Sequence, residues 1–223
     1  MGADVAQEWL LPWWWENYRA HNCLPVAFFD FGMSRSMRRW CEERGECLDL
    51  STRGLFVAPK EEIDPRLAAE WEKGMGEKFW ERRLAWFKKP FACLKSPFER
   101  TLWSDLDCEI RCRLEPLFRY AEKEPSIATV RWKDGSYNSG IVVFREEASL
   151  LRAWVDIALS SSHLFRGDEE ILGHLFQKRG IAEGALPGVY NWDFKEEGHT
   201  RAEIVHWYGP IGKHAIYEEI AKY

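Results

Sequence analysis

A short apolar run, L-P-V-A-F-F-D-F at residues 24–31, constrains the fold more than any other stretch of the chain. The run is continuous and rich in strand-forming residues, so it predicts a strand buried on both faces of a sheet. Gly32 and Ser34 end this strand, residues 34–44 have the spacing of a helix with a Ser cap, and E-C-L-D-L at 46–50 predicts a second strand. A strand, a helix and a strand in this order indicate a parallel α/β sheet.

The rest of the chain continues this mixture of helices and strands. Residues 7–21 carry large apolar side chains at helical spacing, and Pro12 either kinks this helix or sets a new first turn. Residues 51–75 are expected to form a loop and one helix, and residues 76–94 an amphipathic helix interrupted near Lys89-Pro90. Further strands are expected at 99–107, 127–132, 137–144 and 204–208, and further helices at 146–160 and 168–179.

The composition fits a globular protein and narrows its partners. The 223 residues suit one domain with a substantial core, and a net charge of -5 gives no basic field for gripping a phosphate backbone, so no nucleic-acid partner is expected. The 13 Trp residues suit stacking on bases or sugars, but core filling is the expected role of most of them. The six cysteines show no C-x-x-C or zinc spacing and follow no signal peptide, so reduced thiols and a cytoplasmic location are expected. No apolar run approaches the ~20 residues that span a bilayer.

Two acids one residue apart, Asp105 and Asp107, stand in L-W-S-D-L-D-C-E at the end of a predicted strand. If the backbone is extended there, both side chains point the same way and share one small space. Two such carboxylates can hold a hard divalent ion such as Mg²⁺ or Mn²⁺ between them. The same pattern also occurs in solvated turns, where Asp is favoured. The end of a strand in an α/β sheet is where such folds bind ligands, and this place favours the metal interpretation.

A second group of polar residues follows the next predicted turn. Asn138 and Ser139 offer hydrogen-bonding side chains, and Gly140 leaves the backbone open to close approach, which suits a hydroxyl-rich ligand. A tight turn before a strand is the alternative. Asp168 stands at or near the cap of a predicted helix, where it either caps the helix or orients a substrate.

A third group lies near the end of the chain. His206 stands at the end of a predicted strand, where a lone His is more often a hydrogen-bonded structural residue than a ligand. The following loop changes this balance, because Gly209 and Gly212 leave its backbone accessible and Lys213 offers a charge for phosphate. A metal ligand and a phosphate-binding lysine would then lie side by side.

Taken in order, these motifs resemble the metal-dependent nucleotide-sugar glycosyltransferases of the A-type fold, and most of all the glycogenin and lipopolysaccharide galactosyltransferase family. The resemblance covers residues 4 to 214, nearly the whole chain. It includes the D-x-D pair, the N-S-G triplet, a G-D-E helix start at 167–169, the L-P and Y-N segment at 186–191, and an H-x-x-G motif followed by a lysine. The resemblance implies a Rossmann-like α/β fold, with a mostly parallel central sheet flanked by helices, in one domain of residues 1–223.

The resemblance also implies roles for particular residues. The ligands of Mn²⁺ or Mg²⁺ would be Asp105, Asp107 and His206. The ion would bridge the two phosphates of a nucleotide-diphosphate sugar, which is expected to be a UDP sugar, and stabilise the charge of the leaving group. The residues expected to act on the reacting groups are Asp168, Glu169 and Lys213. The residues expected to bind the donor are Asp4, Lys89, Asn138, Ser139, Gly140, Asn191 and Gly209. The family retains anomeric configuration.

The chain departs from the family in two places. The first strand is missing or truncated on this interpretation, because only Met1 precedes the residues at 2–4 that look like its end. Lys213 follows His206 by seven residues where six is usual, and His214 stands where Pro is expected. A missing central strand exposes unpaired edges, so the alternative function is a catalytically weak or inactive nucleotide-sugar-binding protein of the same fold.

A third candidate function is a metal-dependent phosphohydrolase that uses the same acids, but nothing in the sequence supplies a second metal cluster. The acceptor is left open between a carbohydrate, a lipid and a protein, because acceptor specificity usually lies in variable loops, here 51–75 and 193–201. Peripheral membrane association is also left open. The aromatic helix at 9–18 and the end of the chain could lie on a membrane surface, but both are short and poorly basic, which favours packing.

Overall fold

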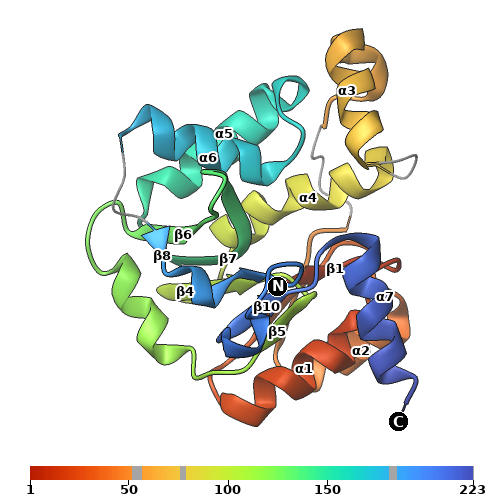
Figure 1. Cartoon of the computed structure of the whole chain (residues 1–223), viewed down its shortest axis with the longest axis vertical. Coiled ribbons are helices and arrows are strands. Elements are labelled where there is room, and N and C mark those ends of the chain that lie inside the picture. The colour runs from red at the N-terminus through yellow and green to blue at the C-terminus, as the bar shows by residue number, and fades with distance from the viewer. Residues whose placement is uncertain (52–56, 76–78, 181–184, 223) are drawn as a thin grey trace.

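The computed structural model describes residues 1–51, 57–75, 79–180 and 185–222 (Figure 1). Strands occupy the middle of the molecule and helices lie on both sides of them. Helices from the two ends of the chain, red to orange and dark blue, lie below the strands in this view, and helices from the middle of the chain lie above them. Within the described residues, no helix is both long and apolar enough to cross a bilayer.

The first three strands form a parallel sheet in the order β1-β2-β3. Their bounds are Gly2–Ala3 for β1, Ala27–Asp30 for β2 and Glu46–Asp49 for β3. All four residues of β2 are buried, which confirms the strand predicted from the apolar run. Helix α2 (Arg35–Glu42) connects β2 to β3, and the Ser34 hydroxyl accepts a hydrogen bond from the Met37 N–H at 3.2 Å. The predicted capped helix and the parallel pairing are therefore confirmed.

The remaining strands form two further groups, in the orders β4-β7-β6-β8 and β5-β10-β9. The bounds are Arg100–Ser104 for β4, Cys108–Ile110 for β5, Ile127–Arg131 for β6, Tyr137–Arg145 for β7, Ala185–Leu186 for β8, Trp192–Asp193 for β9 and Ile204–His206 for β10. Strand β7 pairs antiparallel with both β4 and β6, whereas β8 pairs parallel with β6. The expected α/β fold with a parallel sheet is confirmed, and antiparallel pairs extend it.

Helices cover the strands on two sides. The α-helices not yet given are α1 (Leu10–His21), α3 (Pro65–Met75), α4 (Phe79–Leu94), α5 (Ser149–Ser160), α6 (Asp168–Lys178) and α7 (Gly209–Ile220). The 3-10 helices are η1 (Lys60–Glu62), η2 (Glu115–Ala121), η3 (Ser162–Leu164), η4 (Gly188–Tyr190) and η5 (His199–Arg201). One apolar cluster joins α1, β5 and η2, and a second joins α4, α5 and α6. Pro12 stands in the first turn of helix α1, which agrees with the expectation that it sets a first turn and not with a kink.

Helix α4 continues through Pro90, so the predicted interruption at this proline is wrong. The neighbouring side chains of Lys88 and Lys89 are buried and donate hydrogen bonds to Phe31 and Asp105, directly after β2 and β4, which hold this part of the helix in place. Tertiary contacts therefore outweigh the local effect of the proline. Residues 76–78, which the sequence assigned to this helix, and residues 52–56 of the preceding loop lie outside the described residues.

The segment 209–214 was expected to be a loop, but it forms the first turns of α7. Pro210 stands in the first turn, where its missing N–H leaves no helical hydrogen bond unmade. Gly209 has a φ of 73°, a conformation that L residues with side chains rarely adopt. The proline and the glycine together allow a helix to start directly after β10.

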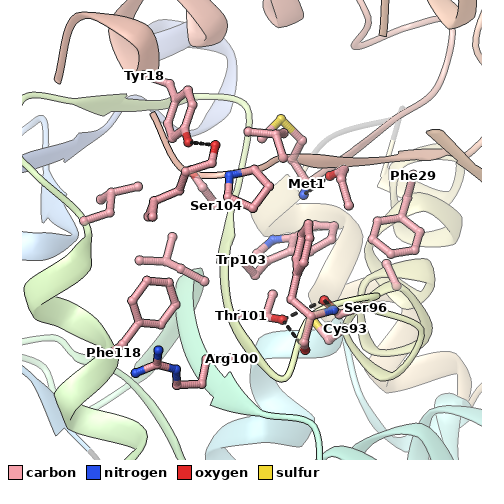
Figure 2. A pocket seen from close by; sticks show the side chains of 18 of the residues that line it. Met1, Tyr18, Phe29, Cys93, Ser96, Arg100, Thr101, Trp103, Ser104 and Phe118 are labelled. Atoms are coloured by element: carbon pink, nitrogen blue, oxygen red, sulfur yellow. Dashed lines mark hydrogen bonds between the residues drawn. The ribbon is translucent and has the colours of Figure 1, made fainter. Parts of the chain in front are cut away.

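A cavity of about 230 Å³ lies between β2 and β4, and Figure 2 shows its lining. Phe29 of β2 and Leu102 and Ser104 of β4 line it, together with residues of α1 and α4. The first strand, which was expected to be missing or truncated, is present as the two residues of β1, parallel to β2. Met1, directly before β1, is one of the residues that line the cavity (Figure 2).

Candidate functional site

The two acids of the D-x-D motif diverge. Leu106 and Asp107 form a turn, closed by a hydrogen bond from the Cys108 N–H to the Asp105 carbonyl at 3.1 Å. The extended backbone that would point both acids the same way is therefore absent here. The Asp105 carboxylate accepts hydrogen bonds from Lys89 Nζ at 2.9 Å and Trp103 Nε1 at 2.7 Å. The extended backbone at this motif is therefore the part of the expectation that is wrong, and the binding of one ion by both acids stays a prediction.

Asp107 belongs to a cluster with two residues from the end of the chain. Strand β10 pairs antiparallel with β5, and this register puts His206 opposite Cys108. The Asp107 Oδ1 atom lies 3.2 Å from His206 Nε2, and Oδ2 lies 2.7 Å from Lys213 Nζ. Burial alone would raise the pKa of Asp107, but Lys213 and His206 hold it well below its usual range. The prediction from the sequence motifs that Asp107, His206 and Lys213 lie side by side is therefore confirmed.

The hydrogen bonds around His206 define which ring nitrogen carries a proton. The Nδ1 atom lies 3.2 Å from Asn138 Oδ1. That oxygen already accepts hydrogen bonds from the Gly140 N–H at 2.9 Å and from Asn191 Nδ2 at 2.7 Å. A nitrogen facing this acceptor has to donate, so Nδ1 carries a proton, and the other ring nitrogen, Nε2, faces the Asp107 carboxylate. The Nε2 atom and the Asp107 carboxylate are two ligand groups 3.2 Å apart, an arrangement that suits a cation bound by both.

The donor atoms of Asp107, Cys108 and His206 all lie within 4.8 Å of one another. Burial, together with the Asp107 and Asp105 carboxylates, holds the pKa of the Cys108 thiol well above its usual range, so the sulfur stays protonated. A carboxylate and an imidazole fit Mn²⁺ or Mg²⁺, whereas a thiol suits softer metals. The residues present therefore fit a hard divalent ion held by Asp107 and His206. Sequence reasoning missed Cys108 as a neighbour, although it directly follows the second acid.

A second cluster surrounds the buried ammonium of Lys89. Its Nζ atom donates hydrogen bonds to Asp105 Oδ2 and Ser139 Oγ, both at 2.9 Å, and lies 3.4 Å from Asp168 Oδ2. The Ser139 hydroxyl in turn donates to Asp168 Oδ2 at 2.7 Å. Burial alone would lower the pKa of Lys89, but the Asp105 and Asp168 carboxylates raise it above its usual range. Lys89 is therefore a charged link between the D-x-D motif and the start of α6.

The same N-S-G triplet also holds the second acid of α6. Asn138 Nδ2 donates to Glu169 Oε2 at 3.1 Å. Burial, reinforced by Asp168, raises the pKa of Glu169 to about 7. Asn191 is fully buried, and its Oδ1 atom accepts no hydrogen bond from the described residues, so this acceptor is unsatisfied here.

Two of the remaining expected site residues have other surroundings. The space above Gly140, which was expected to receive a ligand, is filled by the imidazole of His206. Asp4 follows β1, and its Oδ1 accepts hydrogen bonds from the N–H groups of Ala6 and Gln7, both at 3.0 Å. Among the described hydrogen bonds and ion pairs, none joins Asp4 to either cluster. Its proposed contact with the donor stays a prediction.

No known protein-family model and no curated protein sequence matches the chain. Several solved structures do. A crystal structure of the galactosyltransferase LgtC in complex with donor and acceptor sugar analogs has a TM-score of 0.56 and 14% identity, over 94% of this chain and 86% of LgtC. The chain has the A-type glycosyltransferase fold. The glycosyltransferase GlyE of Streptococcus pneumoniae matches with a TM-score of 0.59 and 16% identity, over 93% of this chain and 54% of GlyE.

The mouse xyloside xylosyltransferase 1 has the same A-type glycosyltransferase fold, with a TM-score of 0.54 and 12% identity over 88% of this chain and 91% of that one. Matches at such low identity show the fold alone. The fold implied by the order of the sequence motifs is therefore confirmed, whereas the roles of the individual residues stay predictions.

Proposed function

We propose that this protein is a metal-dependent glycosyltransferase that transfers a sugar from a nucleotide-diphosphate donor, in the first place a UDP sugar, to an acceptor. The observation that carries the proposal is the pair formed by Asp107 and His206, in which a carboxylate oxygen and an imidazole nitrogen lie 3.2 Å apart. This pair stands in a fold shared with enzymes named for the transfer of galactose and xylose. Retention of anomeric configuration is part of the proposal by resemblance.

The residues divide into those that would hold the ion and those that would hold the donor. Asp107 and His206 would bind Mn²⁺ or Mg²⁺, and Asp105, whose carboxylate contacts Lys89 in this structure, would be the third ligand by resemblance. When bound, the ion supplies Lewis-acid stabilisation of the leaving diphosphate. Asp107 is buried, so the ion would be bound where solvent screens its charge poorly. Lys213, with 28% of its side chain exposed, is placed to neutralise a phosphate near Asp107.

The acids of α6 would orient the sugar. Asp168 is fixed by Ser139 and by the Lys89 ammonium, so its carboxylate has a defined direction before any ligand arrives. Glu169 is held by Asn138, and its raised pKa leaves a part of the molecules protonated at neutral pH. Side by side, a carboxylate can accept a hydrogen bond from one sugar hydroxyl, and a carboxylic acid can donate a hydrogen bond to another hydroxyl of the same ring.

The remaining predicted donor contacts complete the proposal. The unsatisfied Oδ1 atom of Asn191 would accept a hydrogen bond from a sugar hydroxyl once the site opens to the donor. Gly209 at the start of α7 would approach the diphosphate, because the N–H groups of a helix N-terminus favour anions. Asp4 would contact the nucleoside from the end of β1.

Thermal unfolding of the native chain with UDP and with GDP, each with and without Mn²⁺, tests this proposal. A ligand that binds only the folded protein raises the melting temperature. We expect a Mn²⁺-dependent shift with UDP that is lost in Asp107→Asn and kept in Asp156→Asn, a matched change at an exposed site on α5. No shift with either nucleotide would contradict the proposal. Release of UDP from a UDP sugar would then separate an enzyme from the alternative, a protein that binds the donor without turnover.

A further inference from the structure

We propose that Lys213 is the internal counter-ion of Asp107 in the metal-free site and leaves this carboxylate for the diphosphate when the ion and the nucleotide bind together. Lys213 would thus be a positioning residue for the metal ligand as well as a phosphate contact. The inference rests on the proposed function, and it predicts that the divalent ion and the diphosphate bind cooperatively through this lysine.

The Asp107 carboxylate needs a cation in the metal-free protein. It is only 6% exposed, and a buried charge is costly unless it is paired. One of its oxygens faces His206 Nε2 at 3.2 Å and the other faces Lys213 Nζ at 2.7 Å. The Lys213 ammonium makes the shorter of the two contacts, so it is the main counter-ion of Asp107.

A divalent ion would compete with this ammonium for the same carboxylate. The carboxylate and the ammonium together are neutral, so a dipositive ion added to them would bring two uncompensated charges into a buried place. Departure of Lys213 would remove one of these charges, and a diphosphate would neutralise the rest. The ion and the ammonium are therefore alternatives at Asp107.

Lys213 can move, whereas the other lysine of the site cannot. The Lys213 side chain is 28% exposed and Asp107 is its only described hydrogen-bond partner, whereas that of Lys89 is 7% exposed and is bound by Asp105 and Ser139. The backbone beneath Lys213 is fixed, because a Cβ added to Gly212 would lie only 2.2 Å from the Trp207 carbonyl oxygen. Its flexible side chain can then swing without any movement of α7.

A diphosphate gives the departing lysine a new partner. Lys213 stands in the first turns of α7, and a helix N-terminus favours anions. Without the diphosphate, the ion has to displace Lys213 into solvent, so it binds weakly. With the diphosphate, the displaced ammonium gains a charged hydrogen bond, so the ion binds more tightly. Such a coupling is reciprocal, and the ion strengthens diphosphate binding by the same factor.

The test is the dissociation constant of Mn²⁺, measured from the electron paramagnetic resonance signal of free Mn²⁺, with and without UDP. It compares the native chain with Lys213→Met, Lys213→Arg and Lys195→Met. Lys195 is an exposed lysine near the site that contacts the Tyr208 hydroxyl at 3.2 Å, so its loss controls for a general change in charge.

We expect Lys213→Met to bind Mn²⁺ alone about fivefold more tightly than the native chain. The factor by which UDP increases the Mn²⁺ affinity should be about fivefold smaller in Lys213→Met than in the native chain, which is at the lower end of usual coupling. Lys213→Arg keeps the charge and should resemble the native chain, as should Lys195→Met. If Lys213 only stabilised the fold, its loss would weaken Mn²⁺ binding both with and without UDP.

Unchanged or weaker binding of Mn²⁺ alone to Lys213→Met would overturn the inference while leaving the proposed function intact. If Lys213→Met does not fold, Lys213→Gln serves for the same comparison. Absence of Mn²⁺ binding in the native chain, with and without UDP, would overturn the proposed function itself and this inference with it.

Discussion

Gly140→Ala should displace the imidazole of His206 and so weaken metal binding at the candidate site. An added Cβ would lie 2.6 Å from both Cε1 and Nδ1 of the imidazole and 2.9 Å from Asn138 Oδ1. An ordinary contact begins at 3.4 Å, so the ring has to retreat by the difference, about 0.8 Å. The Nδ1 hydrogen bond to Asn138 and the Nε2 contact with Asp107, both 3.2 Å long, limit this movement.

The expected loss of stability follows from these contacts. Crowding of a packed interior costs about 1–3 kcal/mol. The backbone of Gly140 lies outside the positive φ region, so alanine also restricts the unfolded chain and returns about 0.4–1 kcal/mol. The net destabilisation should be about 1–2 kcal/mol. Loss of the residue that orients a metal-binding His typically costs 10–100-fold in affinity, so we expect Mn²⁺ binding to weaken by about tenfold.

Urea unfolding and Mn²⁺ titration of the same samples measure the two effects. Gly188→Ala is the matched control, because an added Cβ there meets nothing within 4 Å. If Gly140→Ala is as stable as the control and binds Mn²⁺ with native affinity, then the imidazole does not need the close approach over Gly140, and our account of the site is wrong.

Three further changes test other parts of the site. Lys89→Met leaves the carboxylates of Asp105 and Asp168 without their shared ammonium, and loss of one partner of a buried ion pair costs about 3–5 kcal/mol; a loss below about 1 kcal/mol in urea unfolding would contradict this role. The native chain should lose stability relative to Glu169→Gln as pH rises from 4.5, the ordinary pKa of Glu, to about 7. In this range the folded native protein still binds the Glu169 proton, whereas the unfolded protein has released it. A melting-temperature difference that is constant from pH 4 to pH 8 would count against the raised pKa. Cys108→Ala should leave Mn²⁺ affinity within about twofold, since a protonated thiol is a poor ligand for hard ions, and a larger loss would make the sulfur a ligand.

The parts of the fold that were predictable from sequence depend on neighbouring residues. Strand β2 follows from a continuous apolar run, and α2 follows from the Ser34 cap and the spacing after it. The order of the site motifs was equally informative, because pairing of β10 with β5 brings His206 beside the D-x-D motif. Lys89 contacts Asp105 of this motif, whereas its expected contact with the donor stays a prediction.

The parts that were not predictable depend on partners distant in the sequence. Asp105 and Asp107 diverge because the chain turns between them, and each carboxylate then meets a different lysine, Lys89 or Lys213. Nothing in the D-x-D motif distinguishes this turn from an extended strand. Pro90 stays within α4 for a similar reason, since the buried lysines beside it are held by other elements. Local propensity cannot include such contacts.

The cavity between β2 and β4 lies at a boundary that matters for how the molecule unfolds. Among the described residues, no strand pair joins the β1-β2-β3 group to the other strands, so helix packing and side chains alone connect them. Groups connected in this way can open independently, and amide hydrogen exchange detects such partial opening. The amides of β2 and β3 should exchange with deuterium sooner than those of β6 and β7. A nucleotide that contacts both the end of β1 and the metal site would link the two groups of strands. Its binding should therefore slow amide exchange in β2 and β3, although these strands lie outside the metal site.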